Sequence, residues 1–263
     1  MFIIKCLIIS AVIFVVIALV LVASQSRSVA TGSGLEFSRA SGLVETAGGV
    51  SVEHRQFIAR DGTELFYRQV EQTNGSRSDI VIILLHGSSA HSGLYASLAA
   101  GLADTGIVIS PDIRGHGQSA PGGDVDYIGQ LEHDLADLIA HINLNDNQKL
   151  VIVGHSSGGG LAVRYGRNGD LPQADGVVLL AYTYRLNTAF APRRDFKQDL
   201  SSLPEFVVIV GENDEAFITE EYAPLLKSFS NSGSVSVIDE LSHLDVIADK
   251  EVHSRIAEFI SAL

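Results

Sequence analysis

The chain has 263 residues, a formal net charge of −13 and one cysteine. This excess of acidic groups excludes a role in nucleic-acid binding, because phosphate recognition needs clustered Lys and Arg. With Cys6 alone, the sequence holds neither an intramolecular disulfide bond nor a metal site made of cysteines.

The first feature in chain order is an apolar run at the N-terminus. Residues 6–23 read CLIISAVIFVVIALVLVA, with Lys5 before the run and the polar SQSRS after it. About eighteen apolar residues nearly span the hydrocarbon layer of a bilayer, and the run is longer than the core of most signal peptides. We therefore expect residues 1–23 to form a transmembrane anchor. A secretory signal peptide cleaved near Ala23 or Ser24 is the alternative.

The charges around this run predict its orientation. Lys5 and the terminal amine favour a cytoplasmic N-terminus, although Arg27 lies close to the other end of the run. The remaining chain is then expected on the membrane, outside the cytoplasm, or secreted if the segment is cleaved. Residues 24–50 are rich in Ser, Gly, Ala and Thr without a sustained period, which predicts a flexible spacer.

Residues 51–263 have the pattern of one domain of the α/β class. Strand-like segments at 52–59 and 64–70 flank Asp61-Gly62-Thr63, a turn signal typical of hairpins. Further strands are predicted at 80–85, 107–110, 149–154, 177–181, 206–210 and 235–238. Helices are predicted at 94–104, 127–142, from about 158 to 167, 217–229 and 249–262. This alternation predicts a mostly parallel, eight-stranded-type sheet flanked by helices.

The carboxyl ends of parallel strands meet at one edge of a sheet, where α/β folds place their chemistry. Gly154-His155-Ser156-Ser157-Gly158 follows one predicted strand and opens a glycine-rich helix. A sharp turn that exposes a nucleophile needs glycine on both sides, because larger side chains would clash with the tight backbone. The pattern predicts Ser156 as a nucleophile; an idle serine in a glycine-rich turn is the alternative.

A nucleophilic serine needs a base, and the base needs an orienting acid. Asp214 follows the predicted strand 206–210, and His243 follows the predicted strand 235–238. Both strands end at the same edge as Ser156, so we expect His243 as the base and Asp214 as its acid. Rival acids are Glu212, Glu215 and Asp239. His253, on the last predicted helix, is expected at the surface.

Two backbone N–H groups are expected to form an oxyanion hole, one from the residue after the nucleophile and one from the loop after strand 80–85. These residues are Ser157 and Ser88, with Ser89 as the alternative second donor. We expect His86 to organise its loop by hydrogen bonding. Asp112 and Arg114 are expected to be paired or to cap the following turn.

Three motifs carry a resemblance to a known family. HGSSAHSGLY (86–95), PDIRGHGQS (111–119) and GHSSGG (154–159) resemble the α/β-hydrolase superfamily, in particular its monoacylglycerol lipase and lysophospholipase-like branch. The resemblance covers about residues 52–263. It implies the α/β-hydrolase fold and hydrolysis of carboxylic esters through an acyl-enzyme, with no metal or organic cofactor.

The resemblance leaves several functions open. Lysophospholipid-like, monoacylglycerol-like or small acyl esters are the expected substrates, with the membrane as a partner through the N-terminal segment. A peptidase or acyltransferase of the same fold is an alternative. A non-catalytic, membrane-tethered binding domain is another, although its usual sign, a missing member of the triad, is absent here.

The segment that follows strand 177–181 departs from the lipase-like relatives. Only about 24 residues, from Tyr182 to Glu205, precede the next strand, whereas those relatives commonly insert a larger helical lid. A short cap predicts an open, shallow site. Tyr182, Tyr184 and Phe190 are candidates to line it; alternatively they pack over the edge of the sheet.

Overall fold

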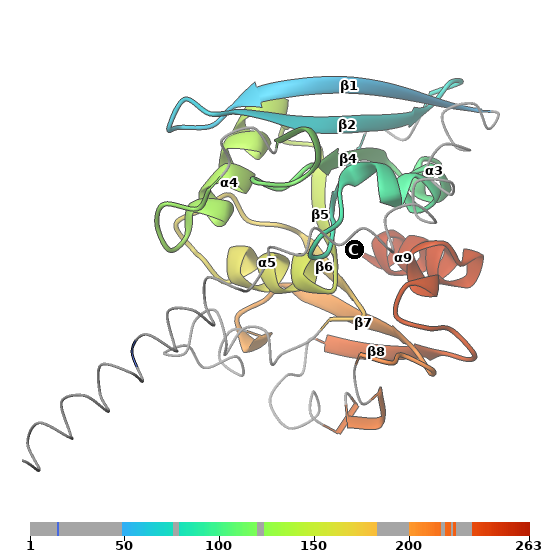
Figure 1. Cartoon of the computed structure of the whole chain (residues 1–263). Helices are drawn as coiled ribbons and strands as arrows, with labels where there is room; N and C mark the ends of the chain where they lie inside the picture. Colours follow the sequence, from blue (N-terminus) through green and yellow to red (C-terminus); the bar gives the residue numbers. More distant parts are fainter. Residues whose placement is uncertain are drawn as a thin grey trace, which may run out of the picture. The chain divides into compact units, whose positions relative to one another are not determined.

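One eight-stranded sheet forms the centre of the chain in the computed structural model (Figure 1). The strands are β1 (Val50–Ile58), β2 (Glu64–Gln72), β3 (Ile80–Leu85), β4 (Ile107–Pro111), β5 (Lys149–His155), β6 (Gly176–Leu180), β7 (Glu205–Gly211) and β8 (Gly233–Ile238). Their order is β1-β2-β4-β3-β5-β6-β7-β8. The pairs β1–β2 and β2–β4 are antiparallel, and every pair from β4 to β8 is parallel. The predicted mostly parallel sheet is confirmed.

The structure describes residue 15 and residues 49–75, 79–119, 124–182, 200–216, 219–221, 223–224 and 233–263. The chain divides into two compact units, Met1–Arg39 and Ala40–Leu263, and the sheet lies in the second. Among the described residues, which include only Val15 from the predicted anchor, no helix is long and apolar enough to cross a membrane. Apart from Val15, the predicted anchor lies outside the described residues.

Helices cover both faces of the sheet. The described helices are α3 (Ala96–Leu102), α4 (Gln130–Ile142), α5 (Ser157–Gly166) and α9 (Lys250–Ala262). Short 3₁₀ turns are η1 (Ser92–Tyr95), η2 (Gly117–Ser119), η3 (Thr219–Glu221) and η4 (Asp245–Ile247). Figure 1 shows α4 and α5 on one face and α3 and α9 on the other, and the members of each pair contact one another. The sheet is therefore the middle of three layers.

The central strands are buried on both faces, as their continuous apolar sequences predict. Every residue of β3 and β6 is buried, and so is every residue of β5 after Lys149. A strand covered by helices on both sides has no solvent face to fill with polar residues. The helices therefore hold the carboxyl ends of β3, β5 and β6 in fixed positions. The loops that follow these strands consequently begin from fixed positions at one edge of the sheet.

Helix α4 begins three residues later than its apolar spacing predicts. Gly129 has φ +98°, in the left-handed region, and the helix starts only at Gln130. A glycine adopts this conformation at little cost, and it interrupts the helical path. Residues 124–129 consequently form an irregular segment before the helix, and Ile128 is 86% exposed instead of lying on a buried helix face.

A buried ion pair connects the loop after β4 to α4. Arg114 donates to both carboxylate oxygens of Asp134, at 2.7 and 2.8 Å, and also pairs with Asp61 at 2.9 Å. Asp112 does not pair with Arg114: its carboxylate accepts the backbone N–H groups of Ser92 and Gln118, at 2.6 and 2.7 Å. The expected turn architecture is thus present, with Asp112 capping and Arg114 paired to a residue outside the motif.

We expect Asp134→Ala to lower the free energy of unfolding by about 2–4 kcal/mol, because it leaves the buried Arg114 guanidinium with the partly exposed Asp61 as its one carboxylate and the Thr63 hydroxyl as a neutral acceptor. Urea denaturation followed by circular dichroism measures this change. Arg255→Ala is the control, since Arg255 pairs with Glu251 at the surface of α9, and its expected cost is below about 0.5 kcal/mol. Equal effects of the two variants would contradict the importance of the buried pair.

Candidate active site

Ser156 occupies the sharp turn between β5 and α5. Its backbone angles are φ +52° and ψ −118°, a conformation that non-glycine residues adopt only when the surroundings impose it. A Cβ on Gly154 would lie 2.5 Å from the carbonyl oxygen of Gly158. A Cβ on Gly158 would lie 2.5 Å from the carbonyl oxygens of Leu85 and His86. Both glycines of the motif are therefore required by close backbone contacts.

His243 and Asp214 are brought together from the ends of β8 and β7. His243 Nδ1 lies 3.0 Å from Asp214 Oδ2, and the side chains are 14% and 0% exposed. The other oxygen, Oδ1, accepts the backbone N–H of Ala216 at 2.9 Å. A buried carboxylate that accepts both bonds holds the imidazole in one orientation, with the proton on Nδ1 and Nε2 left as the basic atom.

The rival acids contact other groups. Glu215 accepts the backbone N–H of His243 at 3.1 Å, and Glu212 accepts the backbone N–H of Glu240 at 3.2 Å. Asp239 is exposed. The hydrogen bond donated by the His243 N–H lowers the pKa of the Glu215 carboxyl, so Glu215 remains charged and fixes the backbone of the histidine. Of these acids, Asp214 is the one whose carboxylate is hydrogen-bonded to the imidazole.

A chain of buried hydrogen bonds joins the loop after β3 to His243. The Gly87 N–H donates to the Tyr95 hydroxyl at 2.9 Å, and that hydroxyl donates to His155 Nδ1 at 2.7 Å. His155 Nε2–H then donates to the backbone carbonyl of His243 at 2.9 Å. Tyr95 and His155 are each 2% exposed. Sequence reasoning missed this chain, because nothing in the motif pattern indicates what Tyr95 contacts.

His86 organises the neighbouring loops, as predicted. Its Nε2 accepts the N–H of Ile113 at 2.9 Å, so Nδ1 carries the proton and donates to the Gly87 carbonyl at 2.8 Å. Burial lowers the pKa of His86 to about 4, and burial likewise lowers the pKa of His155 to about 4. Both rings are therefore neutral near pH 7, with one nitrogen donating and the other accepting.

The two expected oxyanion donors lie side by side. The Ser88 hydroxyl donates to the Ser157 hydroxyl at 2.9 Å, which brings the loop after β3 to the start of α5. Within the described part of the chain, neither backbone N–H of these residues has an acceptor. Ser157 is the first residue of α5, where the helix dipole favours negative charge. Ser89, the alternative donor, is the residue with left-handed φ (+59°) in that loop.

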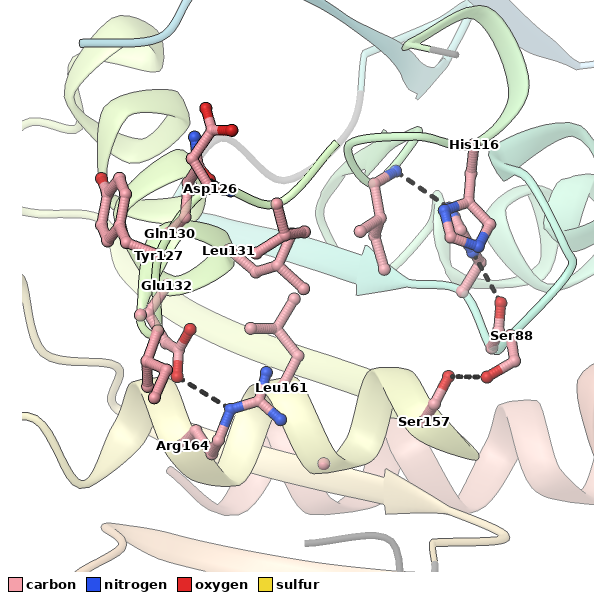
Figure 2. A pocket seen from close by; sticks show the side chains of 17 residues that line it. Ser88, His116, Asp126, Tyr127, Gln130, Leu131, Glu132, Ser157, Leu161 and Arg164 are labelled. Carbon is pink, nitrogen blue, oxygen red and sulfur yellow. Dashed lines mark hydrogen bonds and ion pairs between the residues drawn. The ribbon is translucent and has the colours of Figure 1, made fainter. Parts of the chain in front are cut away.

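A pocket of about 560 Å³ opens beside these two serines (Figure 2). One wall is α5, the opposite wall is residues 125–132, and Ile113 and His116 come from the loop after β4. Its volume lies in the range of small-molecule sites. The lining includes Ser88 and Ser157 but neither Ser156 nor His243, so the pocket extends away from the histidine.

The predicted pocket residues of the cap are placed differently or not described. Tyr182 is 2% exposed and belongs to the hydrophobic core, where it packs against Gly159 at the start of α5. It is not among the residues that line the 560 Å³ pocket. Tyr184 and Phe190 lie outside the described residues. The pocket wall at 125–132 was not predicted, since that segment was expected to be helical from residue 127.

His253 is not a surface residue, contrary to expectation. It packs from α9 against Gly101 of α3, its Nε2 is buried, and burial lowers its pKa. It lies in the layer of α3 and α9, on the opposite face of the sheet from the pocket. No group of His, Cys, Asp and Glu suited to holding a metal ion occurs in the described ranges.

The order of strands and the residues at their ends define the class of protein. A serine on a sharp turn after the fifth strand, an acid after the seventh and a histidine after the eighth are the arrangement of α/β-hydrolases. Residues 76–243, which are 168 of the 263, match the family described as serine aminopeptidase, S33. The chain belongs to this family of serine hydrolases.

Curated relatives match a shorter part of the chain. A non-heme haloperoxidase from Rhodococcus erythropolis is 38% identical over 41% of this chain and 36% of its own length. A monoacylglycerol lipase from Mycolicibacterium smegmatis is 34% identical over 33% of this chain and 32% of its own length. The chain thus spans about a third of the length of these relatives.

Solved structures match over nearly the whole chain. The esterase Est22 superposes with a TM-score of 0.71 at 18% identity, covering 94% of this chain and 92% of the other. The Pyrococcus furiosus esterase Pf2001 gives a TM-score of 0.65 at 18% identity, covering 90% and 98%. At these identities the likeness establishes the fold alone.

The two neutral histidines predict a pH dependence of stability. In the unfolded chain a histidine titrates near pH 6.5, whereas His86 and His155 titrate near 4 when folded. Between these values the unfolded state binds more protons, so stability is complete above about pH 6.5 and is lost as pH falls toward 4. Each histidine contributes a slope of up to about 1.4 kcal/mol per pH unit.

Urea midpoints measured from pH 7.5 to 4.5 test this expectation. The midpoint should fall steadily below about pH 6.5, and His155→Gln should reduce the slope even if it lowers the midpoint at pH 7.5. A midpoint that does not change over this interval would show that neither histidine is held neutral.

Proposed function

We propose that this chain is a serine esterase that hydrolyses carboxylic esters through an acyl-enzyme on Ser156. The observation that carries the proposal is the pairing of His243 with the buried Asp214, at 3.0 Å, beside a serine held at φ +52°. Membership of a serine hydrolase family and similarity to a monoacylglycerol lipase support it. Carboxylic esters of lipid-like or small acyl groups are the substrates that we expect.

The mechanism follows from the roles of these groups. Neutral His243 removes the proton from Ser156 Oγ as that oxygen bonds to the ester carbonyl carbon. The carbonyl oxygen becomes negative and accepts the backbone N–H groups of Ser88 and Ser157. Protonated His243, stabilised by Asp214, then gives its proton to the leaving alkoxide as the ester C–O bond breaks. The alcohol departs and an acyl-Ser156 ester remains.

Water completes the cycle. His243 removes a proton from a water molecule, whose oxygen bonds to the acyl carbon. The second tetrahedral intermediate uses the same two backbone donors, and its collapse breaks the bond to Ser156 Oγ. The proton held by His243 returns to Ser156, and a carboxylic acid is released. No redox step or cofactor enters this sequence.

The position of the pocket indicates on which side of the scissile carbonyl the acyl and alcohol portions of the substrate lie. The leaving alcohol must face His243, because the histidine delivers its proton to that oxygen. The 560 Å³ pocket includes the oxyanion donors but not His243, so it lies on the other side of the carbonyl. We therefore assign the pocket to the acyl portion of the ester and expect the alcohol to lie toward the loop after β8.

The pocket favours an ester over an aminopeptidase substrate. An aminopeptidase needs acidic groups that bind the free amino terminus of its substrate. Glu132 is a carboxylate in the pocket, but it accepts the Nε–H of Arg164 at 2.8 Å, and that cation balances its charge. Asp126, a second acidic residue of the lining, is exposed at the rim.

The location of the enzyme is part of the proposal. The apolar residues 6–23 would tether the hydrolase to a membrane, with the domain outside the cytoplasm, and would bring it to lipid esters. Secretion after cleavage of this segment is the alternative.

Replacement of the nucleophile tests the proposed chemistry. We expect Ser156→Ala to lower kcat for p-nitrophenyl acetate by several orders of magnitude, because no acyl-enzyme can form. The full-length wild-type chain should react covalently with a fluorophosphonate probe, and the variant should not. Ser254→Ala, on the exposed face of α9, is the matched control and should retain wild-type rates. Labelling and turnover that survive in Ser156→Ala would exclude this serine as the nucleophile.

The buried hydrogen-bond chain predicts a positioning role for Tyr95. Tyr95→Phe removes the hydroxyl that connects the Gly87 N–H to His155, so the loop of the oxyanion hole and the backbone of His243 lose their common support. We expect kcat for p-nitrophenyl acetate to fall about tenfold while KM changes less than about twofold.

Tyr165→Phe is the matched control for Tyr95→Phe. The Tyr165 hydroxyl is buried in the core and has no partner among the described residues, so its removal should leave kcat unchanged and stability equal or higher. If kcat fell equally in both variants, the effect of Tyr95→Phe would reflect the loss of a buried hydroxyl in general and not a positioning role of Tyr95.

A further inference from the structure

The residues of α5 that line the pocket are regularly spaced along the helix. Its lining residues are Ser157, Gly160, Leu161 and Arg164, at positions i, i+3, i+4 and i+7 of the helix. Such residues share one helix face. The face begins at the oxyanion donor Ser157 and ends seven residues later at Arg164, a rise of about 10 Å. Figure 2 shows Arg164 at the opposite end of the pocket from Ser88 and Ser157.

The end of the pocket at Arg164 is charged. Arg164 Nε donates to Glu132 Oε1 at 2.8 Å, and the two side chains are only 17% and 7% exposed. The two Nη atoms of Arg164 and the second oxygen of Glu132 have no hydrogen-bond partner within the described residues. The pair therefore offers several donors and one acceptor to whatever enters this end of the pocket.

The middle of the pocket is apolar. Ile113, Leu131 and Leu161 line it between the serine end and the charged end, and Gly160 adds no side chain. An acyl chain would place its methylene groups against these residues and its far end beside Arg164. A plain alkyl end there would cover the free N–H groups of a guanidinium without replacing their bonds to water, which is costly.

We propose that the enzyme selects esters whose acyl chain carries a neutral oxygen, a hydroxyl or carbonyl, about five to eight carbons from the scissile carbonyl, with Arg164 as the residue that binds it. This inference rests on the proposed esterase function and names its substrate class. The length follows from the rise of about 10 Å, shortened because an arginine side chain leans toward the helix N-terminus, and from carbon–carbon bonds of about 1.5 Å.

The charge balance of the pair favours a neutral oxygen over an anion. Glu132 already compensates Arg164, so a carboxylate on the substrate would bring a second, uncompensated negative charge next to the Glu132 carboxylate. A hydroxyl can accept from an Nη–H of Arg164 and donate to the free oxygen of Glu132. A carbonyl oxygen can accept from the same Nη–H groups.

Matched p-nitrophenyl esters test the assignment with the full-length enzyme. The pair to compare is the 8-hydroxyoctanoate and the nonanoate, which differ by a hydroxyl in place of a methyl group. We expect kcat/KM to be about tenfold higher for the hydroxy ester in the wild type. In Arg164→Met, which keeps an unbranched side chain that reaches about as far as the arginine Nε but removes every donor, that ratio should fall to about one or below.

Two further variants keep the comparison informative. Arg164→Lys retains the positive charge beside Glu132 and should fold if the methionine variant does not; its ratio should lie between those of the wild type and Arg164→Met. Arg255→Met, on the surface of α9, should keep the wild-type ratio. A wild-type ratio of one, or a high ratio that survives in Arg164→Met, would overturn the proposal.

An ester that ends in a carboxylate and the short p-nitrophenyl acetate distinguish the remaining outcomes. A wild-type preference for the mono-p-nitrophenyl ester of azelaic acid, which ends in a carboxylate, over the hydroxy ester would overturn the assignment to a neutral oxygen. Turnover of p-nitrophenyl acetate with no preference among the longer esters would reject the specificity and leave the esterase function intact. Absence of turnover with every ester would reject both.

Discussion

The structure of the site depends on one close approach, that of the turn between β5 and α5 to the end of β3. The backbone of Gly158 lies against the carbonyl groups of Leu85 and His86, with no room for a side chain. This contact makes the turn so tight that Ser156 adopts φ +52°. It also brings the loop that carries Ser88 beside the first residue of α5, where the Ser88 and Ser157 hydroxyls are hydrogen-bonded at 2.9 Å. The residues proposed as nucleophile and as oxyanion donors thus have a common structural origin.

Two neutral histidines extend this contact to the other loops of the sheet edge. His86 joins the loop after β3 to the loop after β4, and His155 joins the nucleophile turn to the loop after β8. A neutral imidazole can accept at one nitrogen and donate at the other, in two directions fixed by a rigid ring. Lysine lacks an acceptor, and a charged imidazole lacks one as well. The geometry of the site is therefore tied to a protonation state that burial maintains near neutral pH.

The sequence predicted the residues whose positions follow from the ends of parallel strands. Ser156 and Asp214 follow the buried apolar strands β5 and β7, His243 follows the more exposed edge strand β8, and the parallel order of these strands places them at one edge. The acid could be narrowed only by geometry: Asp214, Glu212 and Glu215 lie within four residues, and the fold shows which carboxylate reaches the imidazole. Their catalytic roles stay predictions.

The sequence did not predict the walls of the pocket, for two physical reasons. The apolar spacing of residues 127–142 continues through Gly129. The left-handed conformation of this glycine, however, makes the helix begin only at Gln130, so Ile128 lies outside it. Long-range partners such as Asp134 for Arg114, Tyr95 for His155 and Glu132 for Arg164 depend on how α4 and α5 pack, and no local pattern encodes that packing. Tyr182, a candidate pocket residue because it belongs to the short cap, instead packs in the hydrophobic core.

The two walls of the pocket differ in secondary structure, and this difference bears on specificity. Residues 124–129 form an irregular rim with exposed apolar side chains, whereas α5 is a regular helix that packs on the sheet. Because Ser157 and Arg164 lie on the same helix, the distance from the oxyanion hole to the charged end is set by helix geometry. Changes in the rim can alter how wide the pocket is, but they do not alter this length. A selection by the position of a polar group along the acyl chain would therefore persist while the rim varies.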